Sequence, residues 1–295
     1  MTRADPTRTT PPMQDAVPII DLDERSIHEE ARLGPLHALR DRHLGTEAGS
    51  PFVIEGELVL ARALASECEI EAILATPTRL DALLPRIMAM DAGRRARLAV
   101  FRAEASAIES IAGFHVHRGV LAVARRGVLA PPSELAARAP MLILLESIAN
   151  IDNMGSIFRN VAALAPKGTG VVLSPDCCDP LYRKAVRVSI GNVLHVPWTR
   201  CVDDATWRGF VEGLRTHERV ALTPDAAAIA LDEFAARRHA GGPSRDRAAL
   251  MVGAEGPGLS AWAMNAADVR VRIPQHQDAD SLNVATALAV ALAGL

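Results

Sequence analysis

Short apolar runs alternate with amphipathic stretches along most of this chain. In the front half, runs of strand length are separated by segments whose apolar residues have helical spacing. The pattern predicts strands at residues 51–56, 70–75, 96–101 and 119–124, and helices at 23–44, 57–65, 80–90 and 104–111. This alternation is typical of a small layered α/β domain.

The same alternation resumes after residue 140. Strands are expected at residues 141–145, 170–173, 192–196, 219–223 and 248–252, with helices between them, which favours a mostly parallel sheet. Asp179-Pro180 has the composition of a helix cap and first turn. We therefore expect a disordered tail at 1–16, a first domain at 17–128, a linker at 129–139 and a second domain at 140–295.

The last part of the chain combines strands with a glycine turn. The buried-strand run 248–252 leads directly into residues 253–260, Gly-Ala-Glu-Gly-Pro-Gly-Leu-Ser. Glycines there let the backbone approach a ligand closely. Residues 269–274, Val-Arg-Val-Arg-Ile-Pro, alternate apolar and charged at period two, and Pro274 ends that strand because it cannot donate to a ladder. Ser281 is a candidate cap for the helix Val284–Ala293, which is apolar on almost every side and so predicts enclosure by protein.

The glycine turn alone does not identify a ligand. Its order, Gly-x-x-Gly-x-Gly, differs from the dinucleotide fingerprint Gly-x-Gly-x-x-Gly, and no Gly-Lys-Ser/Thr follows it. Neither a Rossmann dinucleotide site nor a phosphate-binding P-loop is therefore supported.

A third stretch, Asn153-x-Gly155-x-x-x-Arg159, follows the predicted strand 141–145 and opens a helix that runs to about Ala165. Together with the turn 253–260 and with Ile273-Pro274 and Ser281-Leu282-Asn283-Val284, it resembles the three signature motifs of the SpoU (TrmH-like) RNA ribose 2'-O-methyltransferases of the SPOUT superfamily. Residues 179–189 are also similar to that family. The chain departs from the family pattern at Val161, where Ala is usual, and at Gln275, where Met is usual.

The resemblance implies a SPOUT α/β domain whose chain end is threaded as a trefoil knot, an arrangement that general topology rules treat as a rare exception. It also implies S-adenosylmethionine as methyl donor, a ribose 2'-hydroxyl of RNA as acceptor, and a homodimer paired through the knotted domains. None of these properties follows from the periodicity of the sequence.

The resemblance further assigns residues to the site. Main-chain groups would hold the donor at Leu250, Gly253, Gly256, Gly258, Ile273, Ser281 and Leu282. The catalytic group would comprise Arg159, Asn153, Glu255 and Asn283. Because a guanidinium stays protonated in proteins, Arg159 is easier to defend as a cation that stabilises a developing alkoxide than as a base. Glu255 either holds Arg159 or Asn153 in place or fixes its own glycine turn.

The front half resembles the ribosomal-protein-like substrate-binding domain that often precedes SpoU catalytic domains, through residues 52–56 and 119–123. His115, His117 and Arg118 share one loop there, and their side chains can stack on unpaired bases, so we expect RNA contact. Arg94, Arg95 and Arg97 form a second basic cluster that is at least as well explained as a solvated turn.

Composition restricts the partners. The net charge of −3 argues against indiscriminate binding to a polyanion, so RNA contact must be local. Thirty of the 32 basic residues are Arg. This bias suits phosphate contact and stacking, but a G+C-rich genome would explain it equally well.

The four cysteines do not have the spacing of a zinc site, which favours free thiols and no bound metal. Without a long apolar run or a signal-peptide core, we expect a cytoplasmic protein with no membrane contact.

The resulting hypothesis is S-adenosylmethionine-dependent methylation of a ribose 2'-hydroxyl in structured RNA, with ribosomal RNA favoured over transfer RNA because of the separate front domain. The alternatives are a transfer RNA ribose 2'-O-methyltransferase and a non-catalytic RNA-binding or ribosome-assembly protein on the same fold. A small-molecule α/β enzyme would leave the front domain without a role.

Overall fold

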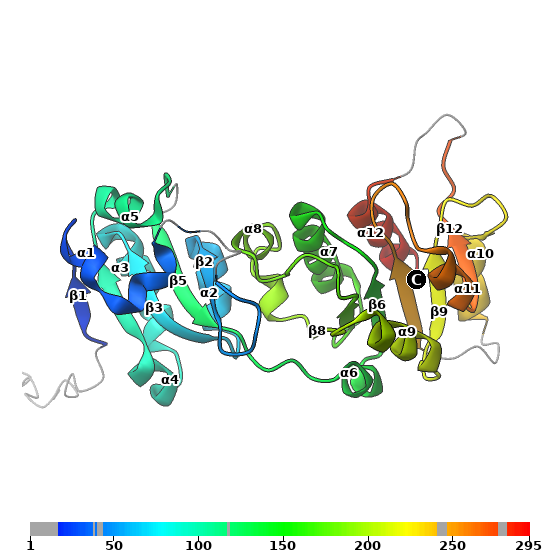
Figure 1. The fold of residues 1–295 in the computed structure, drawn as a ribbon, viewed down its shortest axis with the longest axis horizontal. Helices are drawn as coiled ribbons and strands as arrows, with labels where there is room; N and C mark the ends of the chain where they lie inside the picture. The colour runs from blue at the N-terminus through cyan, green and yellow to red at the C-terminus, as the bar shows by residue number, and fades with distance from the viewer. Residues whose placement is uncertain (1–16, 38, 40–43, 117–118, 241–246, 277–281) are drawn as a thin grey trace, which may run out of the picture.

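The computed structural model describes residues 17–37, 39, 44–116, 119–240, 247–276 and 282–295. Figure 1 shows two α/β units along the long axis of the molecule, the first in blue to cyan and the second in green to red. Each unit is built on its own sheet, as the alternating pattern predicts. The predicted tail 1–16 lies outside the described residues.

The first sheet has five strands in the order β1-β4-β3-β5-β2. Its strands are β1 (Ile19–Asp21), β2 (Pro51–Glu55), β3 (Glu69–Ala75), β4 (Ala99–Arg102) and β5 (Val120–Arg125). β4 is parallel to β1 and β3, whereas β5 is antiparallel to β3 and β2. The four predicted strands are confirmed, with small shifts in their bounds. Strand β1 was missed because its three residues are too few, and too exposed, to show the alternation of apolar and polar positions that predicts a strand.

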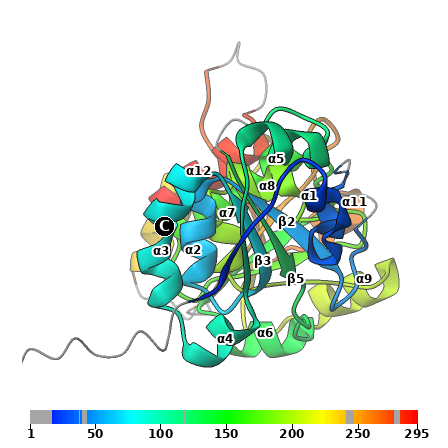
Figure 2. The same cartoon turned by 90° about the vertical axis from the view of Figure 1, so that its left-hand side faces the viewer.

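Alternate residues along β2 show how this sheet is covered. Phe52 and Ile54 face a core with helices α2 (Glu57–Leu64) and α3 (Pro77–Met88), whereas Val53 faces the core with α1 (Ser26–Glu29) and α5 (Ala105–Ala112). Figure 2 shows α2 and α3 on one side of the sheet and α1 on the other. The period of two therefore places helices on both faces. A short helix, α4 (Ala92–Arg97), precedes β4.

The predicted helix at 23–44 is wrong over residues 23–37, whereas residues 38 and 40–43 lie outside the described residues. Residues 23–37 contain the one-turn helix α1 and a 3-10 helix, η1 (Ala31–Leu36), separated by the extended residue Glu30. Pro35 cannot donate the amide hydrogen bond that an α-helix needs, and the Glu30 carboxylate accepts from the Arg32 amide instead. Burial of Leu33 and Leu36 holds this irregular segment on the sheet.

The second sheet has seven strands in the order β10-β12-β9-β11-β6-β7-β8, and every pair is parallel. Its strands are β6 (Met141–Leu145), β7 (Gly170–Leu173), β8 (Trp198–Arg200), β9 (Glu218–Leu222), β10 (Ile229–Ala230), β11 (Ala248–Val252) and β12 (Val269–Arg272). The expected parallel sheet is confirmed. Whether the chain end is threaded as a knot stays a prediction.

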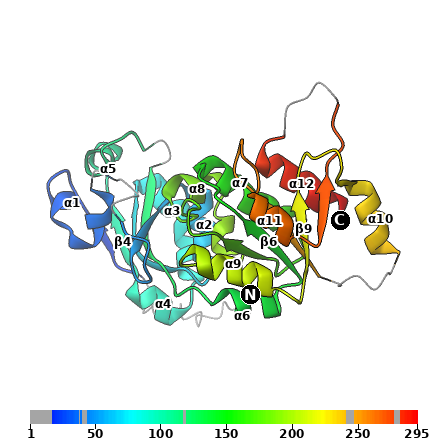
Figure 3. The same ribbon diagram turned by 45° about the vertical axis from the view of Figure 1, so that its right-hand side comes forward.

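Helices cover both faces of this sheet. The helices are α6 (Pro132–Arg138), α7 (Ile151–Leu164), α8 (Arg183–Val188), α9 (Asp204–Gly213), α10 (Leu231–His239), α11 (Ala261–Ala266) and α12 (Val284–Gly294). Leu250 and Val252 of β11 face the core with α7 and α12, whereas Ala249 and Met251 face the core with α6, α9 and α11. Figure 3 shows α9 and α11 in front of the strands, with α7 and α12 above them.

The predicted strand 192–196 is also wrong. Gly191 adopts a left-handed φ of 75°, and the chain turns into a 3-10 helix, η3 (Asn192–Leu194), before β8 begins at Trp198. The apolar residues of this segment pack into the core without pairing, which the pattern cannot distinguish from a strand. Asp179-Pro180 does not cap α8, which begins at Arg183; the Asp179 carboxylate pairs with Arg126 and accepts from the Leu181 amide.

The predicted linker 129–139 contains α6, and this helix packs on the second sheet. Ala136 and Ala139 are buried there, and the missing side chain of Gly170 leaves room for Leu135, whose Cγ would lie 2.8 Å from an added Cβ. The core of the second unit therefore begins before residue 140.

We expect a fragment of residues 130–295 to melt at a higher temperature than one of residues 140–295. Losing α6 uncovers apolar surface, and a loss of about 2 kcal/mol corresponds to about 4–8 °C at this size. Thermal unfolding followed by circular dichroism measures the difference. Equal melting temperatures would show that α6 is only a tether.

Candidate active site

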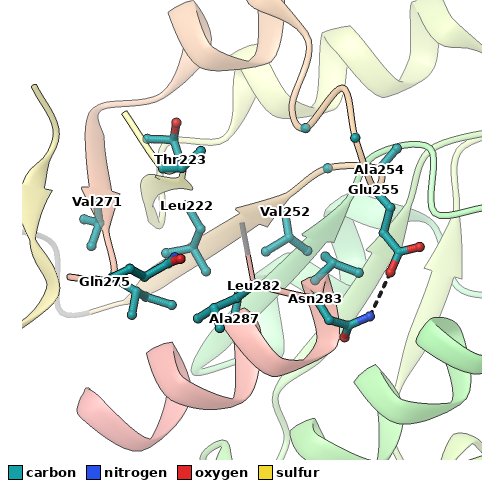
Figure 4. A pocket seen from close by; sticks show the side chains of 16 residues that line it. Leu222, Thr223, Val252, Ala254, Glu255, Val271, Gln275, Leu282, Asn283 and Ala287 are labelled. Carbon is teal, nitrogen blue, oxygen red and sulfur yellow. Dashed lines mark hydrogen bonds between the residues drawn. The ribbon is translucent and has the colours of Figure 1, made fainter. Parts of the chain in front are cut away.

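A cavity of about 430 Å³ opens where β9, β11 and β12 end. Its wall consists of the segments that follow these strands and the start of α12: Leu222, Thr223, Pro224, Val252, Gly253, Ala254, Glu255, Gly256, Gly258, Val271, Ile273, Gln275, Leu282, Asn283, Val284 and Ala287. Figure 4 shows the side chains around it. The carboxyl ends of parallel strands are the usual ligand-binding edge of an open α/β sheet.

The glycine turn after β11 is tightly folded against itself. A Cβ added to Gly253 would lie 2.2 Å from the carbonyl carbon and oxygen of Gly258, so only glycine fits. Gly256 and Gly258 have left-handed φ angles of 87° and 72°. At the far end of the turn, the Glu146 carboxylate accepts from the Ser260 amide at 2.7 Å and from its hydroxyl at 2.9 Å. The turn is thus anchored and presents main chain to the cavity.

Asn283 connects the three sequence motifs through one side-chain amide. Its Oδ1 caps α12 by accepting from the amides of Ala285 and Thr286. Its Nδ2 donates to Asn153 Oδ1 at 2.9 Å and to Glu255 Oε1 at 2.7 Å (Figure 4 draws the second bond). The structure therefore brings Asn153, Glu255 and Asn283 together. Asn283, not the predicted Ser281, caps this helix, and Ser281 itself lies outside the described residues.

Helix α7 holds Asn153 in this arrangement. The Asn150 side chain caps α7 by accepting from the amides of Asp152 and Asn153, and Asn153 is only 6% exposed. A second cavity, of about 230 Å³, lies at this helix start and is lined by Ser147, Ile148, Ala149, Asn150, Asn153, Ala254, Glu255 and Val284. Glu255 lines both cavities, so a carboxylate stands at their shared wall.

The loop between β6 and α7 is held by a neighbouring carboxylate. Ser147 has a left-handed φ of 57°, which is uncommon for a residue with a side chain, and its hydroxyl donates to Asp176. Burial works to raise the pKa of Asp176, but hydrogen bonds from Ser147 and Ser174 outweigh it, so this pKa lies below its usual value. An ionised Asp176 thus fixes one wall of the smaller cavity.

Arg159 does not join this network. It lies six residues after Asn153 on α7, about 9 Å further along the helix axis. Its side chain is exposed and makes no hydrogen bond or ion pair with another described residue. Arg159 lines neither cavity. The Glu255 carboxylate is therefore linked to Asn153 through Asn283, and it does not hold Arg159.

The remaining predicted donor residues are divided. Gly253, Gly256, Gly258, Ile273 and Leu282 line the larger cavity, whereas Leu250 lies in the middle of β11, fully buried and paired on both sides. The segment Leu222–Pro224 was missed. It lines the cavity because β9 is the neighbour of β11, and strand order across a parallel sheet cannot be read from spacing along the chain.

The predicted RNA-contacting residues lie in the first unit. His115 is exposed and forms a pair with Glu109, whereas His117 and Arg118 lie outside the described residues. Two arginines of the other basic cluster have structural partners: Arg94 donates to the Cys68 carbonyl at 2.7 Å, and Arg95 to the carbonyls of Met88 and Met90. These two guanidiniums fasten α4 to its surroundings.

Within the described ranges, no three His, Cys, Asp or Glu side chains are placed to hold a metal ion. None of the described helices is long and apolar enough to cross a membrane.

The fold and the convergence of three motifs define an α/β protein with a cavity, lined partly by main-chain groups of a glycine turn, at the ends of parallel strands. The model of the SpoU rRNA Methylase family matches residues 140–293, and the chain belongs to this family.

Full-length relatives support this assignment. The chain is 39% identical over 277 residues to an uncharacterized tRNA/rRNA methyltransferase of Mycobacterium bovis, a match that covers 92% of this chain and 91% of the relative. A Mycobacterium tuberculosis protein of the same description matches equally well in identity and coverage. The similarity thus extends well beyond the second unit.

Solved structures share the fold of both units. An rRNA methyltransferase from Sinorhizobium meliloti superimposes with a TM-score of 0.72 at 19% identity, over 94% of this chain and 96% of the other. The SpoU methyltransferase AviRb from Streptomyces viridochromogenes, solved with AdoMet, gives a TM-score of 0.68 at 22% identity, over 90% and 97% of the two chains.

Proposed function

We propose that this protein transfers the methyl group of S-adenosylmethionine to a ribose 2'-hydroxyl of RNA. One observation carries the proposal: the Asn283 side chain joins Asn153 and Glu255 at the wall between a main-chain-lined cavity and a smaller neighbouring cavity. A donor held in the first cavity and an acceptor held in the second would meet at this wall. Family membership and the printed names of the relatives agree with RNA methylation.

The larger cavity fits S-adenosylmethionine. A nucleoside needs close main-chain hydrogen bonding for its base and apolar walls for its ring, and the turn from Gly253 to Gly258 and the residues Ile273 and Leu282 provide both. When bound, the donor supplies an electrophilic methyl group. The chain's own task is to align donor and acceptor, since orientation alone can remove several kcal/mol of the barrier.

At the acceptor, we assign Arg159 the role of a fixed positive charge. A guanidinium does not lose its proton in a protein, so it stabilises developing negative charge on the 2'-oxygen and orients a neighbouring phosphate. Asn153 and Asn283 brace the acceptor side, and Glu255 fixes the amide of Asn283. This division separates donor binding, on the turn, from acceptor activation, on α7.

We further propose that residues 17–128 recognise the RNA and residues 140–295 carry out the transfer. Ribosomal RNA is favoured over transfer RNA as substrate because the extra front domain suits a large structured target. The relatives are described as tRNA/rRNA methyltransferases and one structural neighbour as an rRNA methyltransferase, which supports RNA as the substrate class. A cytoplasmic location accompanies this proposal as a prediction.

Two measurements test the proposed function. Calorimetry with S-adenosylmethionine gives donor binding, and transfer of a labelled methyl group to unmodified bulk RNA, followed by nuclease digestion and mass spectrometry, identifies 2'-O-methylated nucleosides. Absence of donor heat would favour a non-catalytic RNA-binding protein. Donor heat without labelled RNA would favour a small-molecule enzyme. Mapping of the label to ribosomal or transfer RNA decides the substrate.

We also propose a homodimer that pairs through α12. The sequence predicts that this helix is enclosed by protein, yet in one chain only one face is buried, with Leu288 and Ala291 inside. Thr286, Val290 and Ala293 form an exposed stripe at helical spacing on the other face. Because a second copy would cover the same stripe on both chains, the contact would be isologous.

The dimer leads to a complementation prediction. Arg159 is remote from the cavities of its own chain, so we expect it to serve the partner's donor site. Mixing Arg159→Ala chains with Gly256→Trp chains should then restore part of the activity through heterodimers with one intact composite site. Light scattering gives the oligomeric state. A monomer at working concentration would exclude the proposed homodimer. A dimer whose activity is not restored after verified subunit exchange would exclude only the proposal that the active site is shared between the two chains.

A further inference from the structure

The two sheets are joined through α8, and the junction contains a carboxylate shielded from solvent. Glu55, the last residue of β2, is 6% exposed and accepts from Arg187 at 2.6 Å and from Arg183 at 3.2 Å. A second pair, Arg126 and Asp179, crosses the same junction at 2.7 Å with both side chains 6% exposed. The positive charges of Arg183 and Arg187 on α8 are thus partly neutralised by a carboxylate of the first unit.

Further contacts fix the junction from both sides. Arg62 of α2 donates to the Ile190 carbonyl at 3.0 Å and to the Asn192 side chain at 2.7 Å. The Arg183 guanidinium also lies 4.1 Å from the ring centre of Phe114, which neighbours His115 in the loop after α5. The apolar core is continuous here, since Phe52 of the first unit and Met154 of α7 belong to one cluster.

On its other side, α8 is packed directly against α7. A Cβ on Gly155 would lie 2.7 Å from Val188 Cβ and 2.8 Å from the Ala185 carbonyl oxygen, so the two helices touch at backbone distance. Lys184 and Asp152 form an ion pair at 2.6 Å across the same interface. Gly155 lies two residues after Asn153 and four before Arg159. A shift of α8 therefore moves the helix that carries both.

We propose that Glu55 is a positioning residue for methyl transfer. By holding Arg183 and Arg187, it fixes the position of α8 and, through α8, the position of α7. The position of α7 in turn determines where Asn153 and Arg159 lie. This inference rests on the proposed function. Removing the carboxylate takes away two charge-assisted hydrogen bonds between β2 and α8, from Arg183 and Arg187, whose side chains are 21% and 44% exposed, and so loosens the contact between α8 and β2. Because a misplacement of about 1 Å can reduce a rate by about 100-fold, a small shift of α7 is enough to slow transfer.

The test compares Glu55→Gln with Glu71→Gln in the full-length protein. Glu71 is a matched control, since it also pairs with an arginine of the first unit, Arg125, but more than a third of each side chain is exposed. We expect Glu55→Gln to lower kcat for methyl transfer by about tenfold. Its donor affinity should stay within about twofold of wild type, because no residue of α8 lines the larger cavity. Glu71→Gln should retain wild-type kcat.

A second readout does not depend on RNA. Amide hydrogen exchange across residues 151–164 should become faster in Glu55→Gln than in wild type and Glu71→Gln. If Glu55→Gln does not fold, Glu55→Asp replaces it, because its shorter side chain keeps the charge but cannot reach both arginines. Wild-type kcat together with unchanged exchange in α7 would overturn the proposal, as would a kcat loss matched by an equal loss of donor affinity.

The two proposals fail separately. If the wild-type protein methylates no RNA, the proposed function is wrong, while faster exchange in α7 of Glu55→Gln still supports the junction. If wild type is active and both Glu55 variants behave as Glu71→Gln does, the proposed function stands and Glu55 has no positioning role.

Discussion

Replacing Arg159 by alanine is expected to reduce methyl transfer by at least about 100-fold while leaving donor affinity within about twofold of wild type. The side chain is exposed and lines neither cavity of its own chain, so its loss removes no contact from that chain's donor pocket and no burial from its core. Only the charge offered to the reacting oxygen disappears. Single-turnover methyl transfer measures the rate, and calorimetry measures donor affinity.

The matched control for this substitution is Arg237→Ala, which removes an exposed arginine from another helix, α10. It should transfer methyl groups at the wild-type rate. Arg159→Lys should recover little activity, because an ammonium cannot reproduce the two-pronged geometry of a guanidinium. Wild-type turnover by Arg159→Ala would exclude a catalytic role for this side chain.

Substituting alanine for Gly253 should weaken donor binding by at least about 100-fold, because about 2.7 kcal/mol is lost when a preformed site cannot close. The added Cβ would lie 2.2 Å from the Gly258 carbonyl and 2.3 Å from the Leu259 amide nitrogen, so the turn must open. The turn lies beyond the end of β11, and the sheet itself is not disturbed. Calorimetry with S-adenosylmethionine measures the loss, and circular dichroism checks the fold.

Gly209→Ala serves as the control. Gly209 lies within α9 and an added Cβ meets nothing within 4 Å, so donor affinity should be unchanged and the helix more stable by roughly 1 kcal/mol. Donor heat from Gly253→Ala equal to that of wild type would show that the turn does not grip the donor.

Much of the fold could be predicted because strand length and period are local properties. Residues 141–145, 170–173 and 248–252 were predicted with their observed bounds, since continuous apolar runs between turn residues leave little choice. Residues 192–196, Asn-Val-Leu-His-Val, also look like a strand from their apolar residues, but they begin with the 3-10 helix η3 after the left-handed Gly191. The failure at 23–44 has the same origin, because tertiary burial of Leu33 and Leu36 overrides helical periodicity around Pro35.

For the candidate site as well, the motif residues could be predicted from the sequence, whereas the contacts between distant parts of the chain could not. The motif residues Asn153, Glu255 and Asn283 could be singled out by resemblance, and they converge in space. Their hydrogen-bonding order could not be predicted: Asn283 is the centre, and Glu255 reaches Asn153 only through it. The contribution of Leu222–Pro224 depends on the neighbour relation of β9 and β11. The role proposed for Glu55 depends on a contact between residues more than a hundred positions apart.

The hydrogen bond between Asn153 and Asn283 spans 130 residues, and this separation bears on folding kinetics. Contacts so distant in the chain cost more loop-closure entropy than local contacts and tend to form after local helices and strands. We therefore expect the docking of α12 to follow the folding transition state, so that weakening Asn283 accelerates unfolding more than it slows folding. A chain that has built both sheets but has not docked α12 would possess its core without an assembled site.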